Sequence, residues 1–259
     1  MAAAALAYRW PGPLPICAVR KVESSKETDT MPAGGDSSFI RRSTLRQQIA
    51  DALRDEVLAG RLPSGHPFTV KEIAEQYGVS ATPVREALLD LCAQGLLDVE
   101  QHRGFKVHAF SAGDFVAMVE ARTLIIEGIF RSGAEHALRA TPAEVLISIR
   151  RRADEAERAA RAGDLDVLIG YDLRFWRELG SIVGNPYISD FLDRVRVQTW
   201  MFAVPLLRGM DDLGARLWHG HSQLAKALVQ YDIAEAQRLI AEYNEHSLAL
   251  VGNRGEHSG

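Results

Sequence analysis

The sequence predicts a mainly α-helical protein that is built in two parts. Helix-capping motifs begin at Thr44 and Thr69 in the first part, and a short hairpin pattern follows them near residues 96–110. From residue 112 onward the chain shows only helical periodicity, interrupted by glycine, proline and capping residues. We therefore expect a head of three helices and a β-hairpin, followed by an all-α antiparallel bundle of six helices.

The three helices of the head are predicted from their caps. Thr44 to Gln47 (TLRQ) and Thr69 to Glu72 (TVKE) are capping boxes, in which the two side chains bond free backbone N–H groups. The first helix is expected to run to about Ala59, and the segment GRLPSGHPF after it is expected to be a loop. The second helix should end at Gly78, which suits a left-handed turn.

The third helix and the hairpin complete the head. Ser80 is expected to cap the third helix, with Pro83 in its first turn and Gly95 at its end. The segments LLDVE and FKVHAF then alternate as two strands around the turn QHRG. Two helices joined by a tight Gly-Val-Ser turn and followed by a hairpin have the outline of a winged helix-turn-helix.

The second part is expected to hold six helices, near residues 112–139, 142–162, 165–183, 186–207, 212–230 and 232–251. The segment from Thr141 to Glu144 (TPAE) has the pattern of a capping box with proline at the first helical position. Asp164 should cap the next helix, and Asn185, followed by proline, should cap the one after it.

Composition restricts the class of protein less than the motifs do. The chain has 259 residues, 47% of them hydrophobic, and a net charge of −4, so whole-chain charge does not indicate nucleic acid. Cys17 and Cys92 form no metal or disulfide pattern, which favours a reducing, cytoplasmic location. No apolar run reaches the roughly 18 residues of a membrane helix, so no membrane partner is expected.

We expect disordered ends at 1–40 and 254–259, a head at 41–109 and a helical domain at 110–253.

The run GVSATPVREALLDLCAQGLLDVEQHRGFKV resembles the GntR family of bacterial transcription regulators. The helical remainder resembles, more weakly, the FCD ligand domain of the FadR branch in its VanR-like form. The resemblance implies that the third helix enters the DNA major groove with its N-terminal turn. The matching DNA-contact positions are Lys71, Ser80, Ala81, Thr82, Arg85, His102, Arg103 and Gly104. Ala81 departs from the family, which usually has arginine there, and an alanine can contact only a thymine methyl group.

Four polar residues interrupt the apolar stripes of the bundle helices. They are Arg122, Asp172, His221 and Tyr243. Because buried polar groups need partners, these side chains should meet each other, a ligand or a metal. One alternative is a closed cluster, in which Arg122 pairs with Asp172 and His221 bonds Tyr243. The other alternative, which we favour, is a ligand cavity.

The resemblance also bears on metal binding. Many FCD domains hold a divalent metal through one aspartate and three histidines, and the matching positions here are Asp172, Trp176, His221 and Tyr243. Two histidines are thus missing, although His246 lies one turn after Tyr243. We expect no cofactor and no tightly held metal, with Asp172, His221 and His246 as a weak alternative set.

The sequence instead predicts an effector site for a small organic acid, made by Arg122, Asp172, Trp176, His221, Tyr243 and His246. Arg122 and His221 are expected to bind its carboxylate, and Trp176 and Tyr243 to provide flat walls. The predicted function is a ligand-responsive repressor that binds an inverted-repeat operator as a homodimer. The alternatives are an enzyme that uses Asp172, His221 and Tyr243 in acid–base chemistry, and a protein-interaction module. No nucleophile motif or phosphate loop supports an enzyme, and only Ala81 favours an interaction module.

Overall fold

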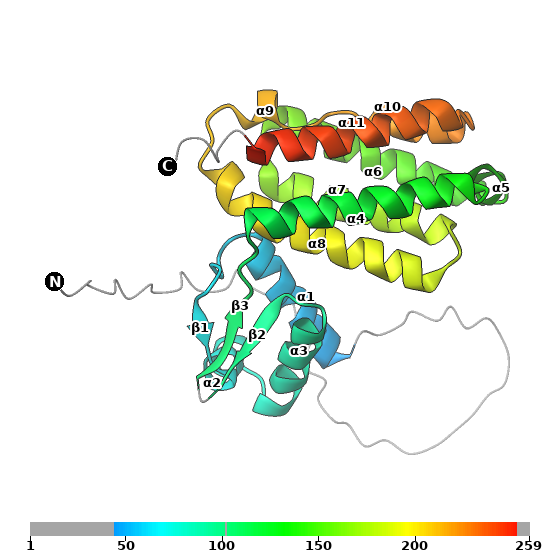
Figure 1. The fold of residues 1–259 in the computed structure, drawn as a ribbon. Coiled ribbons are helices and arrows are strands. Elements are labelled where there is room, and N and C mark those ends of the chain that lie inside the picture. The colour runs from blue at the N-terminus through cyan, green and yellow to red at the C-terminus, as the bar shows by residue number, and fades with distance from the viewer. Residues whose placement is uncertain (1–43, 102, 253–259) are drawn as a thin grey trace, which may run out of the picture.

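The computed structural model describes residues 44–101 and 103–252. The predicted disordered ends, and His102 of the predicted wing, lie outside the described residues. Figure 1 shows a small head of helices and a sheet that lies against one side of a larger helical bundle. The predicted fold class, a winged helix-turn-helix followed by an all-α bundle, is confirmed.

The head contains α1 (Leu45–Leu58), α2 (Val70–Tyr77) and α3 (Ala81–Ala93). Both predicted capping boxes are present, with Thr44 and Thr69 each bonding the backbone three residues later. Gly78 takes the left-handed conformation after α2, with φ of 63°. The tight connection between α2 and α3 follows from this turn, and the apolar faces of α1 and α3 pack together in the head.

The sheet of the head has one strand more than the hairpin that the sequence predicts. Strands β2 (Leu97–Glu100) and β3 (Gly104–Val107) form the expected antiparallel hairpin. The segment GRLPSGHPF is not all loop, because Pro67–Phe68 forms β1 and pairs with the outer side of β3. Phe68 is buried opposite Phe105, so burial of one aromatic side chain holds this short strand in place.

Gly104, where β3 begins after the turn of the wing, has a structural role that can be tested. Its φ is +102°, and a Cβ atom there would lie 2.4 Å from the carbonyl oxygen of Phe68. We expect Gly104→Ala to lower the free energy of unfolding by about 1–3 kcal/mol, because both the conformation and the β1 contact oppose a side chain. Urea denaturation measures the change. Gly128→Ala, at an open position inside a helix, is the control and should be neutral or stabilising by up to about 1 kcal/mol.

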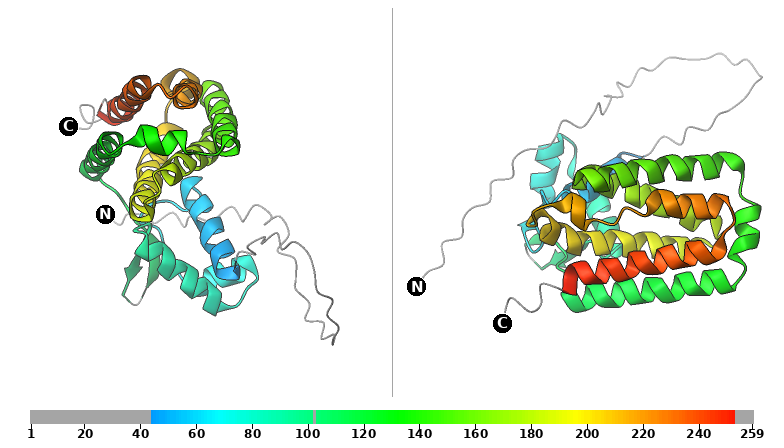
Figure 2. Two further views of the ribbon diagram at one scale, coloured as in Figure 1. Left: turned by 90° about the vertical axis from the view of Figure 1, so that its right-hand side faces the viewer. Right: turned by 90° about the horizontal axis from the view of Figure 1, so that it is seen from above.

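The bundle has six main helices, as the sequence predicts, and two short ones. The main helices are α4 (Ala112–Arg131), α6 (Ala143–Ala162), α7 (Leu165–Ile182), α8 (Pro186–Arg208), α10 (His221–Val229) and α11 (Ile233–Gly252). The short helices are α5 (Ala134–Arg139) and α9 (Leu213–Arg216). Figure 2 shows the main helices running roughly along one axis, with α5 across the end of the bundle that lies farthest from the head.

Two predicted helices are therefore wrong in extent. The helix expected over 112–139 is broken at Gly133, whose φ of 103° turns α5 away from α4. The helix expected over 212–230 is broken after Arg216, where Leu217 is extended and buried. The apolar residues on either side of each break are half-buried or buried, namely Phe130 and Leu138 at the first and Leu213 and Leu217 at the second. Apolar periodicity alone therefore does not reveal the break, where most of the intervening residues are exposed.

The caps of the bundle helices match the predictions at Asp164 and Asn185, which each bond the following backbone. The capping box predicted from Thr141 to Glu144 is wrong. Pro142 takes the N-cap position there, and the Thr141 hydroxyl donates to the carbonyl oxygen of Ala137 instead. Thr141 therefore closes α5 rather than opening α6.

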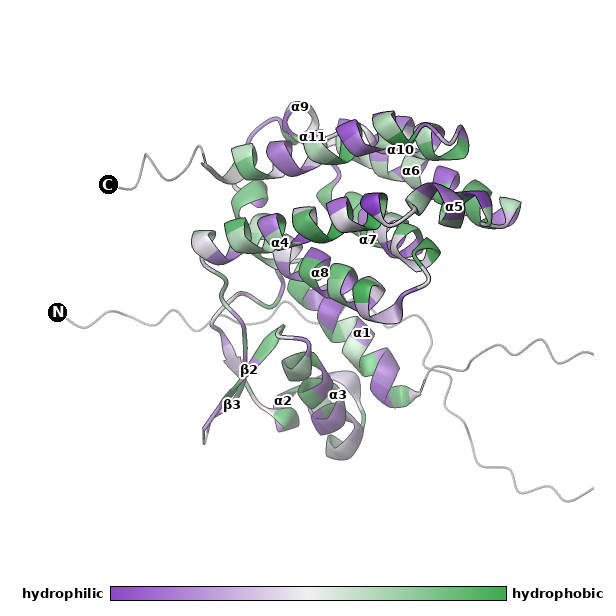
Figure 3. Ribbon diagram, turned by 45° about the vertical axis from the view of Figure 1, so that its right-hand side comes forward, coloured by the Kyte–Doolittle hydropathy of each residue, from purple (hydrophilic) through white to green (hydrophobic). Residues whose placement is uncertain are grey.

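Hydrophobic residues recur along each main helix and alternate with hydrophilic ones, as Figure 3 shows. Their buried faces form two clusters, one shared by the head and the near side of the bundle, the other around α10 and α11. Among the described residues, no helix has the length and apolar content to cross a membrane.

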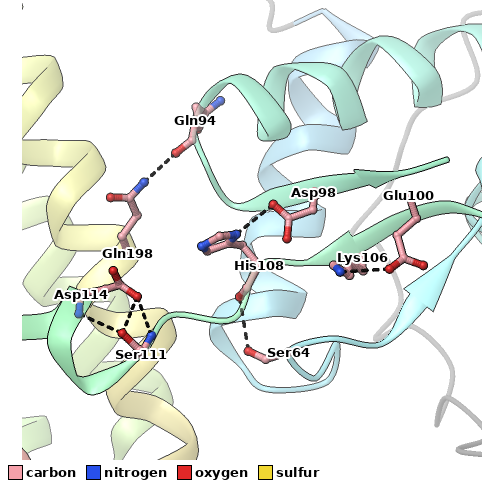
Figure 4. Close-up of polar contacts among 9 residues, drawn as sticks. All are labelled: Ser64, Gln94, Asp98, Glu100, Lys106, His108, Ser111, Asp114 and Gln198. Atoms are coloured by element: carbon pink, nitrogen blue, oxygen red, sulfur yellow. Dashed lines mark hydrogen bonds and ion pairs between the residues drawn. The ribbon is translucent and has the colours of Figure 1, made fainter.

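The head joins the bundle through α4 and α8. Ser111 caps α4 directly after the wing strand, and Asp114 bonds back to its backbone at 2.8 Å (Figure 4). On α8, the Gln198 amide donates to the backbone carbonyl of Gln94 at 3.0 Å, at the end of α3. The helix α4 thus follows directly from the wing strand, and α8 contacts the C-terminal end of α3.

Candidate nucleic-acid interface and effector site

The N-terminal turn of α3 is open to solvent. Ser80, Ala81, Thr82 and Arg85 are all exposed there. Ser80 occupies the predicted N-cap position, but its side chain makes no capping hydrogen bond. The hydroxyl group and the first backbone N–H groups of α3 therefore remain available to a phosphate, and the helix dipole favours an anion at this end.

Basic side chains flank this turn. Lys71 is exposed on α2 and lies 3.7 Å from Glu75, a weak surface pair. Arg85 and Arg103 are exposed and have no ion-pair partner among the residues that the structure describes. Lys71, Ala81 and Arg85 also line one shallow hollow between α2 and α3. Arrangement rather than total charge thus makes this face suitable for a nucleic-acid backbone.

The second candidate site lies inside the bundle and is centred on Asp172. This carboxylate is 1% exposed and accepts three hydrogen bonds. Its Oδ1 accepts from Trp176 Nε1 at 2.9 Å and lies 3.0 Å from His221 Nε2. Its Oδ2 accepts from Trp200 Nε1 at 2.8 Å. Both carboxylate oxygens of Asp172 therefore have hydrogen-bond partners, which come from α7, α8 and α10.

Two buried arginines surround this carboxylate without pairing with it. Arg122 is 1% exposed and donates to the amide oxygen of Asn244 at 2.7 Å. Arg196 is 4% exposed and donates to the hydroxyl oxygen of Tyr243 at 2.6 Å. Both bonds go to neutral groups. The described part of the bundle therefore buries two guanidinium groups against one carboxylate, and this excess of positive charge is unfavourable in the absence of an anion.

The pKa values reflect this charge balance. Burial, and then the like charge of Arg196, lowers the pKa of Arg122 to about 9, so Arg122 remains a cation at neutral pH. Burial alone would raise the pKa of Asp172, but hydrogen bonds from His221 and Trp200 and the charge of Arg196 outweigh it and lower that pKa. Asp172 is thus ionised, and it neutralises only one of the two arginines.

A polar cavity of about 60 Å³ opens beside these groups, toward the end of the bundle that carries the head. Arg122, His221, Tyr243 and His246 line it together with apolar side chains. Three buried nitrogen atoms of these residues have no hydrogen-bond partner in the described part of the chain. They are Arg122 Nε, His221 Nδ1 and His246 Nε2. Such atoms are costly to bury unless a ligand or water bonds them, which makes this cavity suitable for a small polar group.

The structure brings the predicted effector residues together but not in the pairs of the closed-cluster alternative. Arg122 bonds Asn244 rather than Asp172, and Tyr243 bonds Arg196 rather than His221. Trp176 is not a wall of the polar cavity, because its N–H is directed to Asp172 and its ring faces a different cavity.

Three members of this buried polar cluster are not predicted from the sequence, namely Arg196, Trp200 and Asn244. The only signal for Arg196 is its position between Val195 and Val197, two buried residues of α8.

The residues do not fit the metal site that the resemblance implies. Among the described residues, no group of three or more His, Cys, Asp or Glu side chains is arranged to hold a metal ion. At the positions of two missing histidines, Trp176 is a donor to Asp172, and the Tyr243 hydroxyl is occupied by Arg196. The Asp172 oxygens, which would be metal ligands, already accept three hydrogen bonds.

Comparisons with known proteins agree with both halves of this architecture. Residues 45–107 match the bacterial regulatory proteins of the gntR family, and residues 117–246 match the FCD domain. The second match alone covers half of the chain. The first of these two descriptions is of regulatory proteins.

Individual relatives extend the comparison. Over 93 residues the chain is 42% identical to a protein of Paenarthrobacter nicotinovorans that is named as a probable D-xylose utilization operon transcriptional repressor, covering 36% of this chain and 41% of that protein. It is 30% identical over 169 residues to an uncharacterized HTH-type transcriptional regulator of Agrobacterium vitis, covering 65% of this chain and 95% of that one. The chain thus spans well under half of the first relative and nearly all of the second.

A solved structure shows the same fold over both parts. E. coli McbR/YncC superposes with a TM-score of 0.67 at 22% sequence identity, covering 82% of this chain and 99% of that one. At this identity the likeness concerns the fold alone. Together with the two family matches, it shows that the chain belongs to the gntR family of bacterial regulatory proteins and carries an FCD domain after its winged helix-turn-helix.

Proposed function

We propose that this protein is a DNA-binding transcription regulator that is released from its operator by a small organic anion. The observation that carries the DNA-binding part is the exposed N-terminal turn of α3, with its uncapped Ser80 and its unpaired Arg85. Family membership supports the same conclusion. Since two relatives are named as repressors, we propose repression as the mode of action.

The operator is proposed to be a short inverted repeat that is bound by a homodimer. Two-fold protein symmetry places two reading heads on two half-sites related by the same symmetry. In each head Ser80, Thr82 and Arg85 would contact the major groove, with Lys71 on the backbone. Arg103 and Gly104 of the wing, together with His102, would lie against the neighbouring groove. Ala81 would supply only an apolar contact, so specificity would rest more on Arg85.

The effector is proposed to bind in the polar cavity as a carboxylate. Arg122 would supply a charge-assisted hydrogen bond to the carboxylate. His246 Nε2 and His221 Nδ1, which have no partner among the described residues, would bond further polar atoms of the effector. Because His221 donates to Asp172 through Nε2, its Nδ1 would act as an acceptor, for example from a hydroxyl group. A bound anion would also neutralise the second buried arginine, which Asp172 leaves unbalanced. The 60 Å³ cavity suits a carboxylate group and a few further atoms, so the effector would be a small organic acid.

Signalling to the head is proposed to run through α4 and α8. Phe115, in the first turn of α4, and Leu207, near the end of α8, both line the polar cavity. On α8, Trp200 bonds Asp172, while Gln198 bonds the carbonyl of Gln94 in the head. An anion that binds one arrangement of these helices more tightly would therefore also change the positions of the reading heads.

Fluorescence anisotropy with the DNA that flanks the gene tests the proposal. We expect specific binding that survives random duplex competitor and weakens with salt, because phosphate contacts release counterions. Arg85→Ala should weaken specific binding by about 1–3 kcal/mol, or roughly 5- to 150-fold.

Arg238→Ala is the matched control, because Arg238 is an exposed arginine of α11 that pairs with Glu235 and Glu242. It should leave DNA binding unchanged. Equal affinity of Arg85→Ala and wild type for every duplex tested would contradict the assignment of α3 as the reading helix.

A further inference from the structure

The bundle contains a second and larger cavity at the end that lies away from the head. It has a volume of about 180 Å³ and lies between the end of α4, α5, and parts of α7, α8 and α11. Figure 1 shows α5 crossing this end of the bundle. Most of its lining is apolar, and the main contributors are Ile126, Ile129, Leu138, Leu179, Ile182 and Ile240. It differs from the polar cavity in its place in the bundle and in its larger size, although apolar side chains make up most of the lining of both.

One buried charge faces this apolar space. Arg196 lines the cavity and is 4% exposed. Its guanidinium carbon lies 4.2 Å from the centre of the Trp176 ring, and one nitrogen donates to the Tyr243 hydroxyl. No described residue forms an ion pair with it. The other charged lining residues, Arg177 and Asp193, pair with each other at 3.0 and 3.2 Å, so no residue that lines this cavity forms an ion pair with Arg196.

The size of the cavity indicates what can fill it. An apolar protein cavity of about 150 Å³ stays dry and accepts a benzene ring. A cavity of about 180 Å³ therefore has room for a ring or for a short alkyl chain. A buried guanidinium group at its wall favours a carboxylate, which it can bind with two parallel hydrogen bonds.

We propose that this cavity is a second small-molecule site, which takes a monocarboxylic acid with a ring-sized apolar body, such as an arylacetic acid. Its carboxylate binds Arg196 and its ring occupies the apolar space. The site is separate from the polar cavity, which Tyr243 and Arg122 line and Trp176 and Arg196 do not. Because Arg196, Gln198 and Trp200 lie within one turn of α8, occupancy of this second site acts on the helix that contacts the head.

Calorimetric titration of the full chain with phenylacetate and with phenylacetamide tests this site directly. The two compounds share a ring, and only the first carries a charge. We expect one equivalent of phenylacetate to bind at least tenfold more tightly than the amide. Arg196→Met should remove this preference, whereas Arg122→Met, which changes the other buried arginine, should retain it.

A second variant keeps the test valid if Arg196→Met fails to fold. Leu179→Trp fills the cavity without changing either arginine and should abolish binding of both compounds, with thermal melting as the check on folding. The proposal is overturned if wild type binds no phenylacetate at millimolar concentration, or binds acid and amide equally. It is also overturned if Arg122→Met rather than Arg196→Met removes the preference. None of these outcomes depends on DNA binding, so this proposal and the proposed function can fail independently.

Discussion

Replacement of Asp172 by asparagine should lower the free energy of unfolding by about 3–5 kcal/mol, because among the described residues it removes the one buried carboxylate that lies beside the two buried arginines of the bundle. The amide keeps the shape of the side chain but not its charge. In addition, each carboxylate oxygen accepts from an indole N–H, at 2.9 and 2.8 Å. An amide presents one oxygen and one NH₂ group, so one of these indoles, Trp176 or Trp200, would face another donor.

Urea denaturation with linear extrapolation measures this loss. Asp193→Asn is the control, since Asp193 pairs with the half-exposed Arg177 and should lose less than about 1 kcal/mol. A loss of under about 1 kcal/mol in Asp172→Asn would mean that the two arginines are neutralised in another way.

The pH dependence provides a second check on Asp172. Its pKa is lowered in the folded protein, so the stability that it contributes is present above the ordinary value of 3.8 and is lost as the pH falls toward the folded pKa. The difference between wild type and Asp172→Asn should therefore be constant near neutrality and should narrow below about pH 4. An unchanged difference in acid would contradict the charge-based explanation and favour a purely steric one.

The fold was predictable because local signals and burial agree over most of the chain. The capping boxes at Thr44 and Thr69 place the first two helices correctly, and the turn at Gly78 places the third. The errors arise where tertiary packing overrides a local pattern. Thr141 fits a capping box, but its hydroxyl bonds the previous helix. The strand at Pro67–Phe68 exists only because Phe68 packs against Phe105 of the wing.

The buried polar cluster around Asp172 was predictable in its members but not in its bonds. A polar residue within an apolar stripe is visible in one helix at a time, which is enough to find Arg122, Asp172, His221 and Tyr243. Pairing depends on how helices far apart in the sequence rotate toward each other, and no periodicity contains that information. Arg196 in particular lies in a helix rich in charged residues, and only the structure separates its buried side chain from the exposed ones.

Arg122→Met should produce the second large effect, a separation of stability from effector response. Without a ligand, Arg122 is a buried cation whose hydrogen bond goes to a neutral amide, and its pKa is lowered to about 9. The folded state therefore disfavours its charge. A methionine of similar length removes that penalty, so the free energy of unfolding of the ligand-free protein should be unchanged or higher by about 1–4 kcal/mol.

The same substitution should nearly abolish the response to the organic acid that we propose releases the wild-type protein from DNA. Loss of one partner of a buried charge pair costs about 2–5 kcal/mol, or roughly 30- to 4,000-fold in affinity. Thermal shift with and without the acid, measured beside DNA release, checks both halves of the prediction. A variant that is destabilised without ligand yet still responds would show that Arg122 is a structural residue, and that the anion binds elsewhere. We expect instead that the variant is as stable as the wild type or more stable, and that it no longer responds to the acid. This result would show that Arg122 lowers the stability of the ligand-free bundle and that its role is to bind an anion, as is common for buried functional groups.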